Sequence, residues 1–166
     1  CTVIPVLCGH PLPYMAAALG ADTGEAEAAR LAWQRALEAV AVLRTALAGR
    51  QVIAVAAADL AHVGPAFGDP QPFSPLDKYL VRRADEELLA ACAEGPEAVL
   101  RAVGRIDDRF RICGLSPIAL TLAFTGPVRA EMVAYEQCPA DHDGGDGSIV
   151  SVAGVLLRTC VTSPHP

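Results

Sequence analysis

Two short apolar runs, one on either side of a long helical pattern, constrain the fold of this 166-residue chain more than any other feature. Residues 2–8 read TVIPVLC and residues 52–58 read VIAVAAA, with no charge in either run. Such runs are typical of buried strands. A strand, a helix and a strand in this order predict a βαβ unit in which 2–8 and 52–58 are adjacent parallel strands. The helical pattern between them consists of Leu31, Trp33, Leu37, Val40, Leu43 and Leu47.

Capping and turn signals divide the rest of the chain. Asp22 and Glu25 have the spacing of a capping box, and Gly49 is placed to end the first helix. Ser74 and Pro75 are placed to open a second helix. Further predicted elements are helices at 96–103 and 117–124 and strands at 129–137 and 147–157.

These elements predict an α/β fold with a mixed sheet and helices on both faces. The chain contains no internal repeat and no linker-like stretch, so residues 1–166 are expected to form a single domain.

Composition excludes several classes of partner. The net charge is −6 and no basic run is present, which argues against nucleic acid. The longest apolar run is far shorter than the roughly 20 residues that cross a bilayer, and no signal peptide is visible. The six cysteines form no CxxC pair, so we expect reduced thiols and a cytoplasmic protein.

The run at 52–58 is followed directly by two residues that can do chemistry, Asp59 and His62. Ligands of open α/β sheets bind beyond the carboxyl ends of parallel strands, where this pair is expected. A carboxylate can fix the tautomer of an imidazole or tune it as a base. The alternative is structural: Asp59 caps the following turn and His62 is a partly buried side chain.

Cys113, in RICGLSP, precedes the helix that Pro117 is expected to open. A helix N-terminus lowers the pKa of a nearby thiol, which suits a nucleophile or a metal ligand. The alternative is a small buried apolar residue.

The loop at 140–148, ADHDGGDGS, has aspartates in a calcium-like arrangement, but it lacks the distal glutamate and flanking helices of a calcium loop. A solvated hairpin loop is the better interpretation.

Four segments in order, IPVLCG, VAAADLAHVGPAF, RICGLSPI and YEQ…GSIVSVAG, resemble the C-terminal half of the Memo family, also called AmmeMemoRadiSam system protein B. That family is similar in fold to class III extradiol dioxygenases. The resemblance implies a pocket for iron or copper, with Cys113 as a metal ligand and His62 as the acid–base residue next to Asp59.

This sequence departs from the family pattern in two ways. Ala57 and Ala58 stand where the family usually has two serines. The family's N-terminal half, which carries two further ligand histidines, is not represented, so we expect the metal site to be incomplete in this chain alone.

Two functions therefore remain open. In the first, the chain contributes part of a metal-dependent redox pocket that an N-terminal half or a partner chain completes. In the second, it is a non-catalytic peptide- or protein-binding module that keeps the fold without a complete metal site. A homo-oligomer is a further possible assembly.

Overall fold

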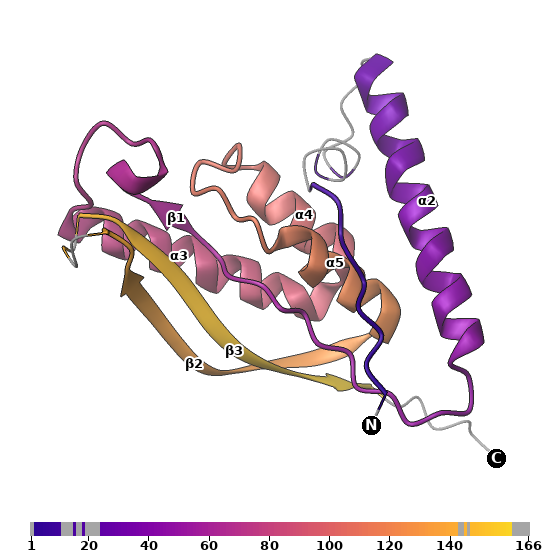
Figure 1. The fold of residues 1–166 in the computed structure, drawn as a ribbon. Helices are drawn as coiled ribbons and strands as arrows, with labels where there is room; N and C mark the ends of the chain where they lie inside the picture. The colour runs from indigo at the N-terminus through magenta and orange to yellow at the C-terminus, as the bar shows by residue number, and fades with distance from the viewer. Residues whose placement is uncertain are drawn as a thin grey trace.

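The structure of this chain is a computed structural model, which describes residues 2–10, Met15, Ala18, 24–142, Gly145 and 147–160. Four α-helices, two short 3₁₀ turns and three strands make up the described part (Figure 1). The helices are α2 (Gly24–Ala46), α3 (Pro75–Ala91), α4 (Pro96–Gly104) and α5 (Leu115–Thr125), the strands are β1 (His62–Val63), β2 (Val128–Pro139) and β3 (Ile149–Thr159), and the 3₁₀ turns are η1 (Pro65–Phe67) and η2 (Cys92–Glu94).

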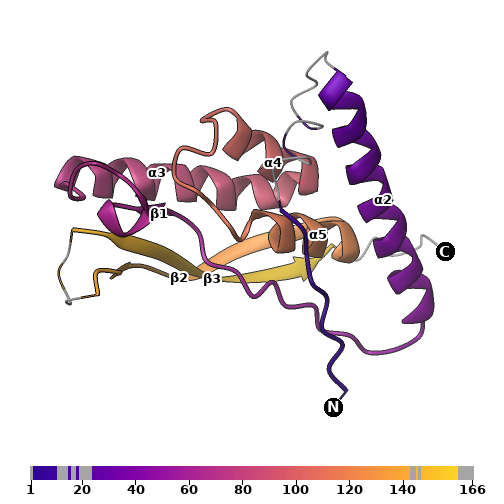
Figure 2. The ribbon, with the colours of Figure 1, turned by 45° about the horizontal axis from the view of Figure 1, so that its top comes forward.

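The sheet is a long hairpin with one short strand added at its end. Its order is β1-β3-β2, and both pairings are antiparallel. The hairpin runs in register from Val128 opposite Thr159 to Pro139 opposite Ile149, with one irregularity between Met132 and Ala134. Figure 2 shows α3, α4 and α5 over one face of this ribbon, while α2 packs against α5.

The α/β fold class is confirmed, and so are most of the local signals. Ser74 caps α3 through a capping box with Asp77, because the Ser74 side chain accepts from the Asp77 amide and the Asp77 carboxylate accepts from the Ser74 amide. The strand predicted at 129–137 lies within β2, and the strand predicted at 147–157 overlaps β3, which begins two residues later, at Ile149. Asp22 lies outside the described residues, so its predicted cap is not addressed. None of the described helices is long and apolar enough to cross a membrane.

The predicted parallel strands are wrong. Residues 2–8 and 52–58 are extended but belong to no strand, and the sheet of the described residues is antiparallel throughout. Their side chains are largely in solvent: Leu7 is 100% exposed and Ile53 is 90% exposed. Apolar composition identified segments with a strand-like conformation, but a strand also needs a neighbour, and no described segment forms a ladder with either run.

The core lies between the helices and the ribbon. Its main cluster joins α3, α4 and α5 through fully buried side chains such as Leu88, Leu100 and Leu122. A smaller cluster around Val63, Val81 and Ile149 packs β1 against α3 and β3. This second cluster holds in place the segment that leads from Asp59 into β1.

One carboxyl group is buried in this interior. Asp85, on α3, has no exposed surface, and the Tyr135 hydroxyl on β2 donates to its Oδ2 at 2.8 Å. Its Oδ1 is buried without a hydrogen-bond partner among the described residues. Burial raises the pKa of Asp85, although the nearby hydroxyls of Ser151 and Tyr135 oppose the shift.

We predict that Asp85→Asn stabilises the fold at pH 7 by about 1 kcal/mol, the scale of one poorly satisfied buried polar group. The folded pKa of Asp85 lies above its unfolded value, so the folded chain binds more protons between the two values. Stability of the unaltered chain should therefore rise as pH falls through this window, and Asp85→Asn should remove that rise. Denaturant unfolding at several pH values measures both effects, with the exposed Asp107→Asn as control. A loss of stability in Asp85→Asn at pH 7 would contradict this.

Candidate metal centre

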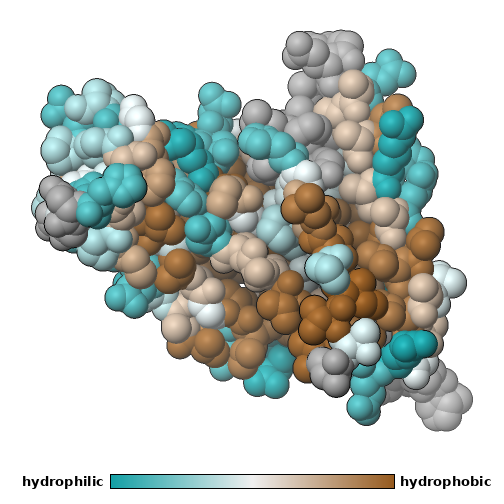
Figure 3. Space-filling view, viewed as in Figure 1, coloured by the Kyte–Doolittle hydropathy of each residue, from teal (hydrophilic) through white to brown (hydrophobic). Residues whose placement is uncertain are grey.

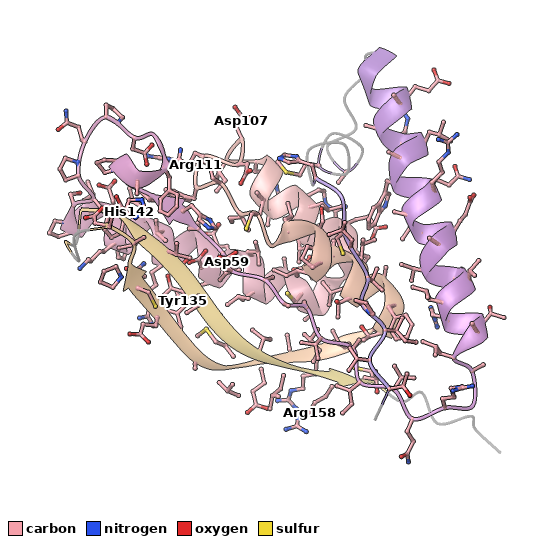
Figure 4. The ribbon with its side chains drawn as sticks, viewed as in Figure 1. Asp59, Asp107, Arg111, Tyr135, His142 and Arg158 are labelled. Carbon is pink, nitrogen blue, oxygen red and sulfur yellow. The ribbon has the colours of Figure 1, made fainter. Side chains whose placement is uncertain are left out.

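Asp59, His62 and Cys113 come together where the extended segment enters β1. One donor atom from each residue can be chosen so that all three lie within 4.8 Å of one another. Asp59 and His62 lie in the same segment, which leads into β1, and Cys113 lies in the turn before α5. Asp59 is labelled near β3 in Figure 4. The convergence expected from the sequence is therefore present, while the roles assigned to the three residues stay predictions.

The His62 ring is held in one tautomer. Its Nδ1 lies 3.0 Å from the carbonyl oxygen of Leu60 and 3.0 Å from that of Arg111. Carbonyl oxygens only accept hydrogen bonds, so Nδ1 carries the proton and Nε2 of the neutral ring keeps its lone pair. Metal-binding histidines are commonly oriented in this way. The ring also lies nearly perpendicular to the Phe67 ring, with centroids 5.0 Å apart.

The free nitrogen of His62 faces a carboxylate. His62 Nε2 is 3.4 Å from Asp59 Oδ2, and the two side chains are 17% and 41% exposed. When the imidazole is neutral, a nitrogen lone pair and a carboxylate oxygen face each other and repel. A metal cation between them would remove that repulsion.

The thiol of Cys113 donates a hydrogen bond to Asp59 Oδ1 at 2.8 Å. Burial and then the hydrogen bond and charge of Asp59 raise the pKa of Cys113 to about 11. The expectation that the helix N-terminus lowers this pKa is therefore wrong. Cys113 does lie just before α5, whose first residue is Leu115, but the adjacent carboxylate and the partial burial outweigh the helix end.

Gly114 lets the cysteine turn approach the aspartate. A Cβ atom at Gly114 would lie 2.2 Å from the Asp59 carbonyl oxygen and 2.6 Å from the Ala58 Cβ. This close contact explains why a glycine follows Cys113: any larger residue at position 114 would push the cysteine turn away from the segment that carries Ala58 and Asp59.

Arg111 supports the site and was not singled out from the sequence. Its backbone is left-handed, with φ of 52°, and presents its carbonyl to the His62 ring. Its guanidinium pairs with Asp69, which also accepts from the Gly64 amide at 2.7 Å; Arg111 is labelled in Figure 4. Burial by itself raises the pKa of Asp69, but the hydrogen bonds from Gly64 and Arg111 hold it below its usual range. No sequence motif predicts a left-handed backbone at an arginine, so the sequence gave no signal that Arg111 orients the His62 ring.

The loop at 140–148 is the connection between β2 and β3, as the hairpin interpretation predicts. Asp141 Oδ2 accepts from the amides of Gly147 at 2.7 Å and Ser148 at 3.2 Å, so this carboxylate closes the loop. Asp143 and Asp146 lie outside the described residues.

The fold and the cluster together define an α/β protein with an Asp–His–Cys constellation at the end of a short strand. The chain belongs to the Memo family, because the Memo-like protein family matches residues 30–156, which include all three residues of the constellation. No curated protein and no solved structure matches the chain.

We predict that Asp59→Asn makes Cys113 more reactive. Removing the charge beside the thiol lowers its pKa from about 11, and each unit raises the thiolate fraction at neutral pH about tenfold. The rate of iodoacetamide labelling of Cys113, followed by peptide mass spectrometry, should rise at least severalfold. Asp107→Asn removes a charge elsewhere and should leave the rate unchanged. Equal rates in all three proteins would show that Asp59 does not control this thiol.

We also predict that Gly114→Ala separates the two halves of the constellation. The added methyl group cannot fit against Asp59, so the cysteine turn must shift, at a cost of about 1–3 kcal/mol in the free energy of unfolding. Labelling of Cys113 should rise as it does in Asp59→Asn. A Cβ atom at Gly154 would come closest to a Val133 methyl group, at 3.2 Å, and then to Ala134 at 3.7 Å, so Gly154→Ala adds the same methyl group with a milder contact and serves as the control. Wild-type stability and labelling in Gly114→Ala would refute the close approach.

Proposed function

We propose that this chain contributes the metal-binding part of a metal-dependent redox pocket. Cys113 would supply the thiolate ligand, and Asp59 and His62 would lie beside the ion. The observation that carries the proposal is the convergence of three donor atoms within 4.8 Å, with Nε2 of His62 left free by the two carbonyls at Nδ1.

The donor set fits the metals that the family resemblance implies. Thiolate and imidazole suit copper, while imidazole and carboxylate suit iron. A cation would also remove the repulsion between His62 Nε2 and Asp59 Oδ2. Bound copper or iron would supply electron transfer and oxygen chemistry that the side chains lack.

Each residue has a distinct task in this proposal. Cys113 must lose its proton to bind a metal, and Asp59 Oδ1, at 2.8 Å, is the acceptor in place to receive it. His62 can take or release a proton at Nε2 while its ring stays fixed by the carbonyls of Leu60 and Arg111. Asp59 thus joins the thiol to the imidazole.

The proposal includes a partner. Of the histidines in the described part of the chain, only His62 joins the cluster. The two further histidines of the family pattern would come from an N-terminal half or from a partner chain, and they would complete the coordination.

A second candidate is a non-catalytic protein-binding module. Exposed apolar side chains along 2–8 and 52–58 favour it, as does the replacement of two hydroxyls by Ala57 and Ala58. The two candidates differ in one property: the first requires metal binding through Cys113, and the second does not.

An anaerobic titration of the purified chain with Cu(I) and with Fe(II) against a competing chelator tests the first candidate. We expect weak binding of one ion per chain and at least tenfold weaker binding in Cys113→Ser, because this variant removes the thiolate ligand. The loss in His62→Gln should be smaller, because His62 lies beside the ion as the acid–base residue. Cys138→Ser leaves the cluster intact and should bind as the wild type does. Metal binding that persists without Cys113 would reject this proposal, and a wild-type chain that binds neither metal would leave the protein-binding module.

A further inference from the structure

The buried carboxyl group of Asp85 lies at the centre of a polar network behind the candidate metal centre. Asp85 of α3 is close to the hydroxyls of Tyr135 on β2 and Ser151 on β3. Asp85 and Ser151 have no exposed surface, so both lie beneath the molecular surface that Figure 3 draws. A polypeptide packed against the outside of the chain would not reach either side chain, so this network belongs to the chain itself.

The Tyr135 hydroxyl has a fixed direction. Gln137 Nε2 donates to the Lys78 carbonyl at 3.0 Å, and a carbonyl oxygen can only accept, so this atom is the amide nitrogen. The same nitrogen donates to the Tyr135 hydroxyl oxygen at 3.0 Å, and that hydroxyl donates to Asp85 Oδ2 at 2.8 Å. One oxygen of Asp85 is thereby occupied, while Oδ1 is buried without a partner among the described residues.

The direction of the Ser151 hydroxyl matters to the site. Its oxygen accepts from the Ala61 amide at 2.9 Å, so a lone pair must point at Ala61 and the hydroxyl hydrogen must point elsewhere. Burial raises the pKa of Asp85, and the Ser151 hydroxyl opposes this shift more than the Tyr135 hydroxyl does. The negative carboxylate attracts the Ser151 hydrogen, which leaves the lone pair directed at Ala61.

Asp85 is an unfavourable residue for the stability of the fold. A buried acceptor without a partner is destabilising, and native proteins keep few of them. Such local conflicts are expected where function needs them. We propose that Asp85 is a positioning residue, which orients the Ser151 hydroxyl toward the Ala61 amide. Ala61 lies between Asp59 and His62, so the positions of both side chains depend on it. The consequence for metal binding rests on the proposed function, whereas the positioning does not.

Amide hydrogen exchange, measured by NMR on the metal-free chain, tests the first step. Asp85→Asn removes the charge, and its amide group would compete with Ala61 for the Ser151 oxygen. Exchange at Ala61 should become at least tenfold faster, although this variant is expected to be more stable. Faster exchange in a more stable protein cannot come from a general loss of stability. Ser151→Ala should have the same effect at Ala61, and adding Asp85→Asn to it should produce no further acceleration.

Ser148→Ala is the matched control. Ser148 is also fully buried and precedes the same strand, and its hydroxyl accepts from the Ala66 amide at 3.0 Å. Its loss should speed exchange at Ala66 and leave exchange at Ala61 unchanged. Asp85→Asn should do the reverse.

The second step is measured at the site. Release of Ala61 should mix the two tautomers of the His62 ring, which the ring nitrogen chemical shifts of the metal-free chain report. Labelling of Cys113 by iodoacetamide should become at least threefold faster, because its thiol is hydrogen bonded to Asp59. In the Cu(I) titration, Asp85→Asn should bind at least threefold more weakly than the wild type.

Three outcomes would overturn the proposal. Unchanged exchange at Ala61 in Asp85→Asn would show that Asp85 does not orient Ser151. Equal acceleration at Ala61 and Ala66 would indicate a general loss of stability. Faster exchange at Ala61 with wild-type His62 shifts and Cys113 labelling would give Asp85 a structural role alone. A wild-type chain that binds no copper would reject the proposed function, while exchange and nitrogen shifts would still decide the positioning.

Discussion

The hydrogen bonds of Ser151 hold the site segment to the rest of the fold. Its amide donates to the Ala61 carbonyl, its carbonyl accepts from the Leu60 amide, and its hydroxyl accepts from the Ala61 amide, each at 2.9 Å. Ser151 is fully buried, so these bonds are shielded from water. They fix the two residues between Asp59 and His62, so the position of this half of the constellation depends on Ser151 of β3.

The cysteine half of the constellation is held by different means. Helix α5 is buried in the main core through Leu115 and Leu122, and the turn before it reaches the aspartate because Gly114 has no side chain. The two halves are also joined directly. The His62 amide donates to the Phe110 carbonyl at 2.7 Å, and Leu60, next to Asp59, lies in the same core cluster as Leu115.

Local signals in the sequence predicted most elements, because capping and periodicity are properties of neighbouring residues. The Ser74 cap, the helices from Pro75 to Thr125 and the two long strands are examples. The resemblance to the Memo family predicted that Asp59, His62 and Cys113 come together, and their donor atoms lie within 4.8 Å of one another. The unpaired state of 52–58 could not be predicted, since pairing depends on what lies beside a run. The raised pKa of Cys113 was also missed, because it depends on a carboxylate 54 positions away in the chain.

The left-handed backbone at Arg111 limits how this family member can diverge. That conformation is costly for β-branched residues and easy for glycine or asparagine, yet only a long cationic side chain at this position can also reach Asp69. Glycine would relieve the backbone and lose the ion pair, whereas valine or isoleucine would lose both. Amino-acid substitution at position 111 is therefore restrained by His62, which lies 49 residues earlier in the chain. The His62 ring is hydrogen bonded to the carbonyl that the left-handed backbone at position 111 presents.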